Sequence, residues 1–300
     1  MFDFLAKPFG VMMEFIYNNM AFGSYAIAIV IFTIIIKILL MPLQIKQQRS
    51  AIKQQEMAPE LKELQRTYGN DRAKMAEEQQ KLYAKYNVSM TAGCLPMVIQ
   101  LPLIMVLYQI IRMPLTYIAG LTNEAITNIA TALQTVAPKV LNNGAVDQLL
   151  VNKTLMDDES LLSLVSKWID KSKIINMDFF GIFNLGDTPS ILFDGSVANR
   201  WALYWPLLLI PLLSFGSAVL LQYISTSKQR EEKKKQKAEG KKQGFDMANG
   251  LMKLMPLLSL VIAFTVPAGL GWYWTVSNLL SIVQTLAINK ILAKQKEGRL

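Results

Sequence analysis

The side chain that stands out in this sequence is a lone lysine inside a long apolar run. Lys37 is the only charged residue between Phe22 and Leu43, a stretch rich in isoleucine and leucine. A charge left in hydrocarbon costs about 3 kcal/mol or more, so it needs either a polar environment or a way out of the lipid. Two interpretations follow from the residues alone. The long stem lifts the ammonium to the interface, or the lysine faces a wet cavity that attracts acidic segments of a passing peptide.

Further polar and aromatic side chains lie in the other apolar runs. Gln100, Gln109 and Arg112 lie in a run that ends near residue 118. The glutamines either line the same cavity as the lysine or hydrogen-bond neighbouring helices, the ordinary role of an isolated glutamine in a membrane helix. Arg112 is close to the end of its run, which favours termination or snorkelling. Trp272 and Trp274 open the last run, where an aromatic belt at the lipid interface is the common explanation.

The residue types that most enzymes use are scarce in this chain. It has no histidine, which excludes Ser-His and Cys-His nucleophile pairs and histidine metal ligands. Its single cysteine excludes an intramolecular disulfide and paired-cysteine metal sites. The phosphate loop and the nucleophile elbow are missing, and no carboxylate lies in the long apolar runs, where a transporter would carry its ion site. We therefore expect no enzyme activity, no cofactor and no metal site.

Hydropathy predicts the elements that hold these residues. The chain has 300 residues, of which 52% are hydrophobic and 18% charged. A helix needs about 20 apolar residues to cross the hydrocarbon core, and five runs approach that length. We predict an all-α polytopic membrane protein with five transmembrane helices, a cytoplasmic helical hairpin and an N-terminal interfacial helix. The predicted segments are 1–21 (amphipathic interfacial segment), 22–43 (span 1), 44–91 (cytoplasmic hairpin), 92–118 (span 2), 119–200 (extracytoplasmic loop with a helical insert), 201–223 (span 3), 224–250 (basic cytoplasmic loop), 251–267 (span 4), 270–289 (span 5) and 290–300 (basic cytoplasmic tail).

Local signals shape the segments outside the predicted spans. Within the hairpin, Gly69 followed by Asn70 and Asp71 predicts the end of one helix and the start of the next. Pro59 predicts a new turn or a kink in the first of these helices. Residues 120–172 contain helical patterns that are not apolar enough to span a membrane, so we expect a small helical cap outside it.

The distribution of basic residues predicts the orientation. Residues 43–91 carry nine Lys or Arg, residues 224–250 carry eight, and residues 290–300 carry four. By contrast, residues 119–200 carry six against nine Asp or Glu, and residues 1–20 carry a single lysine. Lysine and arginine favour the cytoplasmic side of a membrane. Five spans then place the N-terminus outside and the C-terminus inside.

A separate basic segment, residues 227–244, has low sequence complexity. Such a segment can bind anionic lipid headgroups or ribosomal RNA. A solvated cytoplasmic linker that follows the distribution of basic residues explains the same composition without a ligand.

Three sequence strings together resemble those of a known family. The first predicted span ends in MPLQIKQQRS and the second contains GCLPMVIQLPLIMVLYQ. The third string, PAGLGWYWTVSNLLSIVQT, begins in the short connection before the last predicted span and continues through most of that span. In this order and at these intervals the strings resemble the YidC/Oxa/Alb family of membrane protein insertases. The resemblance covers about residues 20–118 and 175–290.

The resemblance implies a five-span core with a hydrophilic groove open to cytoplasm and lipid, and a cytoplasmic hairpin that receives substrates. It implies that Lys37 faces the groove and engages acidic or polar parts of the incoming chain. Gln100 matches a groove-lining glutamine and Trp274 a groove aromatic, and Gln109 and Trp272 are further candidates. Relatives usually carry arginine where this chain has lysine. Lysine keeps the charge but is more easily neutralised by burial, so the groove must stay hydrated.

The function expected from the resemblance is that of a membrane protein insertase and chaperone. Such a protein receives nascent membrane proteins on the cytoplasmic side and inserts their spans into the bacterial cytoplasmic (plasma) membrane without nucleotide hydrolysis. Its expected partners are nascent membrane proteins, lipids, and the ribosome and a secretion channel, but not DNA. The alternatives are a small-solute transporter or channel, and an assembly scaffold for membrane complexes.

Overall fold

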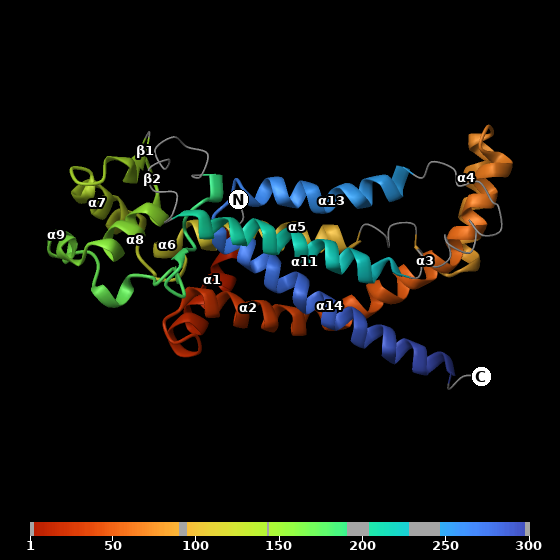
Figure 1. Cartoon of the computed structure of the whole chain (residues 1–300), viewed down its shortest axis with the longest axis horizontal. Helices are drawn as coiled ribbons and strands as arrows, with labels where there is room; N and C mark the ends of the chain where they lie inside the picture. The colour runs from red at the N-terminus through yellow and green to blue at the C-terminus, as the bar shows by residue number, and fades with distance from the viewer. Residues whose placement is uncertain (1–2, 90–94, 143, 191–203, 228–246, 298–300) are drawn as a thin grey trace. The chain divides into compact units, whose positions relative to one another are not determined.

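A computed structural model describes residues 3–89, 95–142, 144–190, 204–227 and 247–297. These residues form helices and two pairs of very short strands (Figure 1), which confirms the all-α prediction. Cys94 and nearly all of the basic segment 227–244 lie outside the described residues. The helices are α1 (Asp3–Asn19), α2 (Tyr25–Leu39), α3 (Met41–Tyr68), α4 (Arg72–Lys85), α5 (Leu95–Arg112), α6 (Pro114–Tyr117), α7 (Asn123–Leu133), α8 (Gln148–Asp157), α9 (Leu162–Val165), α11 (Leu209–Ser225), α13 (Met247–Ala263) and α14 (Ala268–Glu297). The strands are β1 (Leu141–Asn142), β2 (Ala145–Val146), β3 (Asp178–Phe179) and β4 (Phe183–Asn184), and the short 3₁₀ turns are η2 (Pro138–Val140), η3 (Glu159–Leu161), η4 (Lys171–Lys173) and η7 (Trp205–Leu208).

The chain divides into two compact units. Unit 1 consists of Met1–Ile36, Leu103–Leu221 and Asp246–Leu280, and unit 2 consists of Lys37–Pro102, Gln222–Phe245 and Ser281–Leu300.

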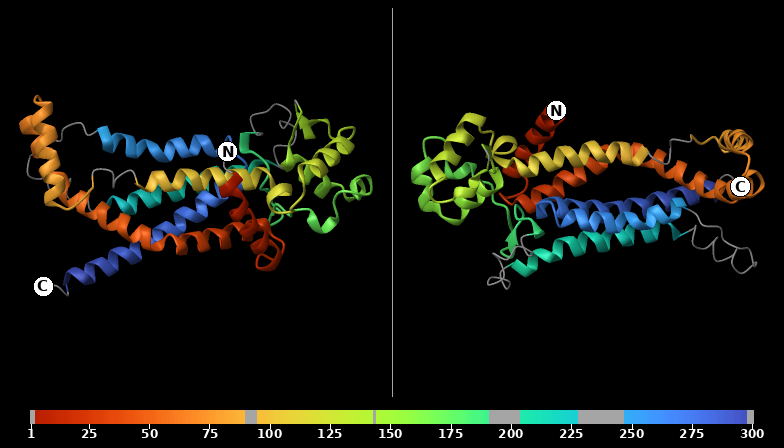
Figure 2. Two further views of the ribbon diagram at one scale, coloured as in Figure 1. Left: turned by 180° about the vertical axis from the view of Figure 1, so that it is seen from behind. Right: turned by 90° about the horizontal axis from the view of Figure 1, so that it is seen from above.

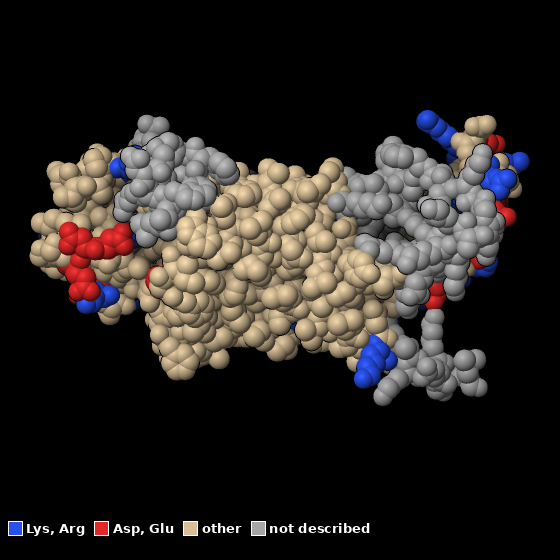
Figure 3. Space-filling view, viewed as in Figure 1, with Lys and Arg blue, Asp and Glu red and all other residues tan. Residues whose placement is uncertain are grey.

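Unit 1 contains a bundle of long apolar helices. The parts of α5, α11, α13 and α14 that belong to this unit run alongside one another (Figures 1 and 2). Their facing side chains are fully buried, as for Ile110 on α5 and Tyr273 on α14. Glycine allows α14 to approach α11 closely, because a Cβ at Gly271 would lie 2.5 Å from Cγ2 of Ile210. On the face shown in Figure 3 the helices of unit 1 present an uncharged surface, whereas charged side chains gather over the insert that follows α5.

The insert of unit 1 runs from α6 to β4 and has its own small core. Helix α7 buries apolar residues at helical spacing, including Ile126, Ile129 and Leu133. The side chains of Thr122 and Asp147 accept hydrogen bonds from backbone N–H groups in the first turns of α7 and α8, which fixes where these helices begin. Between the helices, β1 pairs with β2 and β3 pairs with β4, both antiparallel. The helical prediction for this insert missed these strand pairs, because two residues per strand are too few for an alternating pattern.

Unit 2 contains a helical hairpin made of α3 and α4. Asp71 caps α4 by accepting a hydrogen bond from the Lys74 N–H at 3.1 Å, as its position predicts. Gly69 follows α3 in the right-handed helical region, at a φ of −58°, and not in the left-handed region typical of such glycines. A glycine is needed there for a different reason, since a Cβ would lie 2.5 Å from the carbonyl oxygen of Gln65. Pro59 lies inside α3, which continues through it, so the predicted new turn was wrong.

The helices around the predicted spans differ from the expected boundaries. Helices α2 and α3 are separated only by Leu40 and are bent by 65° there, so the hairpin helix already begins at Met41. Helix α14 continues as one helix from Ala268 to Glu297, into the segment predicted as a tail. The break before α3 falls beside Pro42, and proline favours the first turn of a helix. Helix α14 continues because polar residues favour the helix as well as apolar ones do, so a change of composition does not end it.

The lengths of the apolar helices bear on the number of spans. Among the described residues, Trp205–Ser225 is long and apolar enough to cross a membrane, and the bent pair of α2 and α3 meets the same criterion when taken together. Gln100–Arg112 and Leu254–Ala263 are apolar but shorter. Five spans therefore stay a prediction.

Candidate functional site

Lys37 lies in the last turn of α2, a helix whose other residues are apolar or small. Its Nζ donates a hydrogen bond of 2.6 Å to Oγ of Ser281 on α14, and its side chain is half-buried. A cation near the C-terminus of a helix interacts favourably with the helix dipole. Within the part of the chain that the structure describes, Lys37 has no carboxylate partner. The ammonium is thus held by a neutral hydroxyl, and its positive charge is not cancelled by an ion pair.

The lysine is one end of a row of polar contacts in unit 2. Gln284 on α14 donates from Nε2 to the backbone carbonyl of Lys37 at 3.3 Å. One and a half turns further along α14, Asn289 accepts a hydrogen bond of 3.2 Å from Nε2 of Gln48 on α3. We call Lys37, Gln48, Ser281, Gln284 and Asn289 the polar seam. Their half-buried side chains replace the apolar contacts that two packed helices would otherwise make there.

The predicted groove residues fall in both units. Lys37 and Gln100 belong to unit 2, and Gln100 is half-buried near the start of α5. Trp274 belongs to unit 1 and is half-buried on α14. Gln109, also in unit 1, has a buried carboxamide oxygen without a hydrogen-bond partner among the described residues. The groove role of all four stays a prediction.

Trp272, the remaining predicted groove residue, takes part in packing within unit 1. Its indole Nε1 donates a hydrogen bond of 3.1 Å to the backbone carbonyl of Ala26 on α2. Its ring lies edge-on to Phe179 of β3, with the ring centroids 5.0 Å apart. These contacts join α14, α2 and the strand pair β3–β4, so Trp272 packs within unit 1, and its groove role stays a prediction.

Four members of the polar seam were missed by the sequence reasoning. Ser281, Gln284 and Asn289 lie within eight residues of one another on the same broad face of α14, whose outward positions include the exposed Leu279 and Val283. This spacing of polar residues inside an apolar run was the signal that would have found them. Gln48 carries no such signal, because it lies in a segment that is polar throughout.

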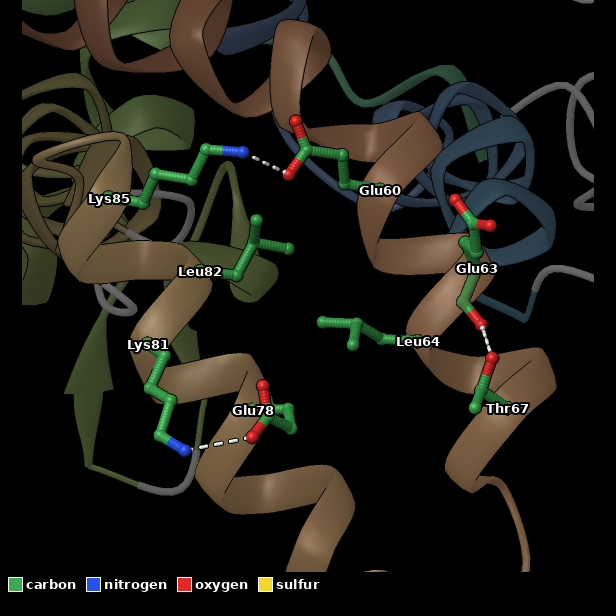
Figure 4. A pocket seen from close by; sticks show the side chains of 8 residues that line it. All are labelled: Glu60, Glu63, Leu64, Thr67, Glu78, Lys81, Leu82 and Lys85. Carbon is green, nitrogen blue, oxygen red and sulfur yellow. Dashed lines mark hydrogen bonds and ion pairs between the residues drawn. The ribbon is translucent and has the colours of Figure 1, made fainter.

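The hairpin of unit 2 carries a hollow of about 450 Å³ between α3 and α4 (Figure 4). Leu64 and Leu82 point into it from the two helices, and glutamates and lysines form its rim. Glu60 accepts hydrogen bonds from Nζ of Lys85 at 2.7 Å and from Oη of Tyr86 at 2.6 Å. These two donors hold the pKa of the Glu60 carboxyl below its ordinary value. An apolar floor with a charged rim suits an amphipathic peptide.

Comparison with known proteins decides the family. Residues 15–296 match the family described as 60Kd inner membrane protein. The chain belongs to this family. Several similar proteins share the name membrane protein insertase YidC. The one from Helicobacter pylori (strain 26695) is 27% identical over 293 residues, which is 98% of this chain and 38% of the relative. The one from Rickettsia bellii is 27% identical over 290 residues, or 97% of this chain and 39% of the relative.

A third relative of that name, from Clostridium tetani, is 42% identical over 87 residues, or 29% of this chain and 40% of its own length. The chain thus spans less than half the length of the relatives that it matches. Membership of the family confirms the resemblance drawn from the three sequence strings. An inner membrane family is also consistent with the membrane location that hydropathy predicts.

Proposed function

We propose that this chain inserts the spans of nascent membrane proteins into the bacterial cytoplasmic membrane, without nucleotide hydrolysis. The observation that carries the proposal is the match of residues 15–296 to an inner membrane protein family whose similar members are named membrane protein insertases. In this proposal the chain crosses the membrane five times, with its N-terminus outside and its C-terminus inside.

The proposed mechanism begins with the charge of Lys37. A hydrated groove lined by Lys37, Gln100 and Trp274, with Gln109 as a further member, receives the polar tail of the substrate. The hydrogen bond from Lys37 to Ser281 positions the ammonium without neutralising it. A carboxylate 4 Å from this ammonium would gain about 1 kcal/mol in bulk water and about 4 kcal/mol at a partly screened site. The groove therefore favours substrates with acidic tails.

The driving force for insertion comes from the substrate itself. A span of about 20 apolar residues gains free energy when it leaves water, at roughly 25 cal/mol for each Å² of apolar surface removed. The groove lowers the barrier, because a polar tail then has a shorter distance of lipid to cross. No nucleotide is needed for a step that runs downhill once the tail has entered.

The hairpin of α3 and α4 is the proposed first contact for the substrate. Its hollow offers Leu64 and Leu82 to an apolar side chain, while the charged rim keeps the site soluble. The ribosome and a secretion channel are proposed partners at this stage.

Insertion by the purified protein tests the proposal and separates it from a scaffold. The protein is reconstituted into liposomes, and a single-span substrate with a short acidic tail is released from translation beside them. We expect a protease-protected fragment of the substrate, at a yield that rises with the amount of protein and does not depend on nucleotide. A scaffold would leave the substrate unprotected, and a small-solute channel would release a trapped dye without protecting the substrate.

A further inference from the structure

Two turns of unit 1 each display a phenylalanine in a backbone conformation that bulky residues avoid. Phe22, between α1 and α2, and Phe180, between β3 and β4, both have a φ of 52°. Each is followed by a glycine that is also left-handed, Gly23 at 69° and Gly181 at 77°. The side chain of Phe22 is 95% exposed and that of Phe180 is 64% exposed, and the neighbouring Ile182 is exposed as well. A left-handed φ carries a steric cost for a residue with a Cβ, and burial of Phe22 cannot offset it.

Hydrogen bonds join the strand pair β3–β4 to the N-terminal ends of two apolar helices. The N–H of Tyr25, the first residue of α2, donates to the carbonyl of Asn176 at 3.0 Å. The N–H of Asn176 in turn donates to Oη of Tyr17 on α1 at 2.8 Å. At the same end of the strand pair, the N–H of Gly269 in α14 donates to the carbonyl of Leu185 at 2.8 Å. The open end of the strand pair is thus fastened to the first residues of α2 and α14. The Phe180 turn lies at its other end, beside Phe179, whose ring contacts Trp272 of α14.

The sequence around the two turns carries almost no charge. No charged residue lies between Phe15 and Ile36, and Asp178 is the only one between Ile174 and Gly186. The carboxylate of Asp178 accepts a hydrogen bond of 2.5 Å from the Gly181 N–H inside the turn, so it is already used. The ring of Phe180 lies edge-on to that of Phe179, with the centroids 4.9 Å apart, but it is still mostly exposed. Exposed, uncharged aromatic side chains suit a lipid interface.

Helix α1, which leads into the first turn, adds a third apolar element. Phe4, Val11 and Phe15 are exposed along one side of this helix, while Met13 and Ile16 are fully buried on the other. The exposed side therefore continues, through the residues after Asn19, to the Phe22 turn.

We propose that Phe22 and the Phe180–Ile182 turn are lipid anchors that enter the membrane interface where α2 and α14 begin. The inference rests on the membrane placement in the proposed function. It assigns to the strand pair β3–β4 the task of holding the insert against the lipid surface, with α1 lying beside it. Phenylalanine fits this task, because its ring enters the boundary between headgroups and acyl chains without needing a polar partner.

Spin labels can measure the depth of the two turns directly. The Cys94→Ser variant has no cysteine and serves as the background. Phe22→Cys and Phe180→Cys are each labelled with a nitroxide in the full chain, reconstituted into phosphatidylcholine nanodiscs. Accessibility of the label to oxygen, which concentrates in lipid, is compared with accessibility to a water-soluble nickel complex. We expect oxygen accessibility to exceed nickel accessibility at both positions.

Three matched positions make the outcome specific. Val136→Cys and Leu164→Cys label exposed apolar residues elsewhere on the insert, and we expect the nickel complex to reach them better than oxygen does. Leu213→Cys labels an exposed position within α11, and we expect oxygen to reach this label better than the nickel complex does, as for a label in lipid.

The outcomes distinguish the anchors from the proposed function. If the labels at positions 22 and 180 are more accessible to nickel than to oxygen while the label at position 213 is more accessible to oxygen, the lipid anchors alone are overturned. If the labels at positions 22, 180 and 213 are all more accessible to nickel, the membrane placement on which the proposed function rests is overturned. If a second copy covers the turns, dilution with unlabelled protein will narrow the spectra of the labels at 22 and 180, and that result also overturns the lipid assignment.

Discussion

The ion pair between Lys153 and Asp187 offers a sharp test of the insert's energetics. Nζ of Lys153 lies 2.6 Å and 2.7 Å from the two carboxylate oxygens of Asp187, and the side chains are only 24% and 13% exposed. Burial raises the pKa of the Asp187 carboxyl in spite of the attraction of Lys153. The backbone carbonyl of Asp187 accepts a hydrogen bond of 2.8 Å from the N–H of Ala268, so local unfolding here also frees the start of α14.

We predict that Lys153→Met destabilises the insert at neutral pH and much less in acid. Without Lys153 a mostly buried carboxylate is left unpaired. An exposed ion pair contributes about 0.2–1 kcal/mol to stability, and loss of one partner of a fully buried ion pair costs about 3–5 kcal/mol. Because this pair is mostly but not fully buried, we expect Lys153→Met to cost about 2 kcal/mol of stability. A carboxyl with a raised pKa in the folded state binds its proton more tightly there than in the unfolded state. The folded insert therefore gains relative stability as the pH falls toward that pKa, and the variant recovers when Asp187 is protonated.

Hydrogen exchange of the insert amides and of Ala268 measures this effect. A cost of about 2 kcal/mol corresponds to exchange about 30 times faster than in the wild type at the same pH. Lys171→Met is the matched control, because Lys171 pairs with Glu159 at 2.7 Å while both side chains are about two-thirds exposed. This control should change exchange by no more than about fivefold. Equal effects of the two variants, or a ratio to wild type that stays constant between pH 8 and pH 5, would refute the reasoning.

Three further predictions concern the hairpin, the helix bundle and the polar seam. The lowered pKa of Glu60 adds a small stabilisation of the hairpin above the ordinary glutamate range, which is lost as the pH falls through that lowered pKa. Amide protection of α3 and α4 in hydrogen exchange should therefore decrease slightly in acid, and Glu60→Gln should weaken this pH dependence. Gly271→Ala should lower the thermal unfolding midpoint of the solubilised protein, since overpacking costs about 1–3 kcal/mol, whereas Gly216→Ala, where a Cβ meets open space, should not lower it. Ser281→Ala removes the hydrogen bond to Lys37 and should increase acylation of that lysine, measured by mass spectrometry of its peptide; unchanged labelling would contradict the contact.

Much of the fold could be predicted because its signals are local. Long apolar runs predict helices, Asp71 is a strong helix start, and the match of the three sequence strings to the family is confirmed. Helix ends were less predictable where composition changes within a continuous helix. The polar residues after position 289 continue α14, and Pro59 is accommodated inside α3.

The candidate site could be predicted in part, for a physical reason. Lys37 is visible in the sequence because a charge in an apolar run is costly wherever it lies. Its partner Ser281 is 244 residues away, and a small hydroxyl inside a helix stands out only through its spacing from Gln284 and Asn289, which does not say what it binds. Trp272 shows the opposite case. It stands out in the sequence, but its indole N–H is bound by the backbone of Ala26 within unit 1.

The measurement that tests the central claim most directly is the effect of charge at position 37 on the choice of substrate. Wild type, Lys37→Arg and Lys37→Glu are each reconstituted into liposomes and given two single-span substrates, one with an acidic tail and one with a neutral tail. The ratio of the two protected yields isolates the role of the charge from general damage. We expect Lys37→Arg to keep the wild-type ratio and Lys37→Glu to lower it by about fivefold or more, since reversal removes at least about 1 kcal/mol of attraction. The same ratio for all three proteins would contradict the claim that the positive charge of Lys37 attracts the acidic tail of the substrate.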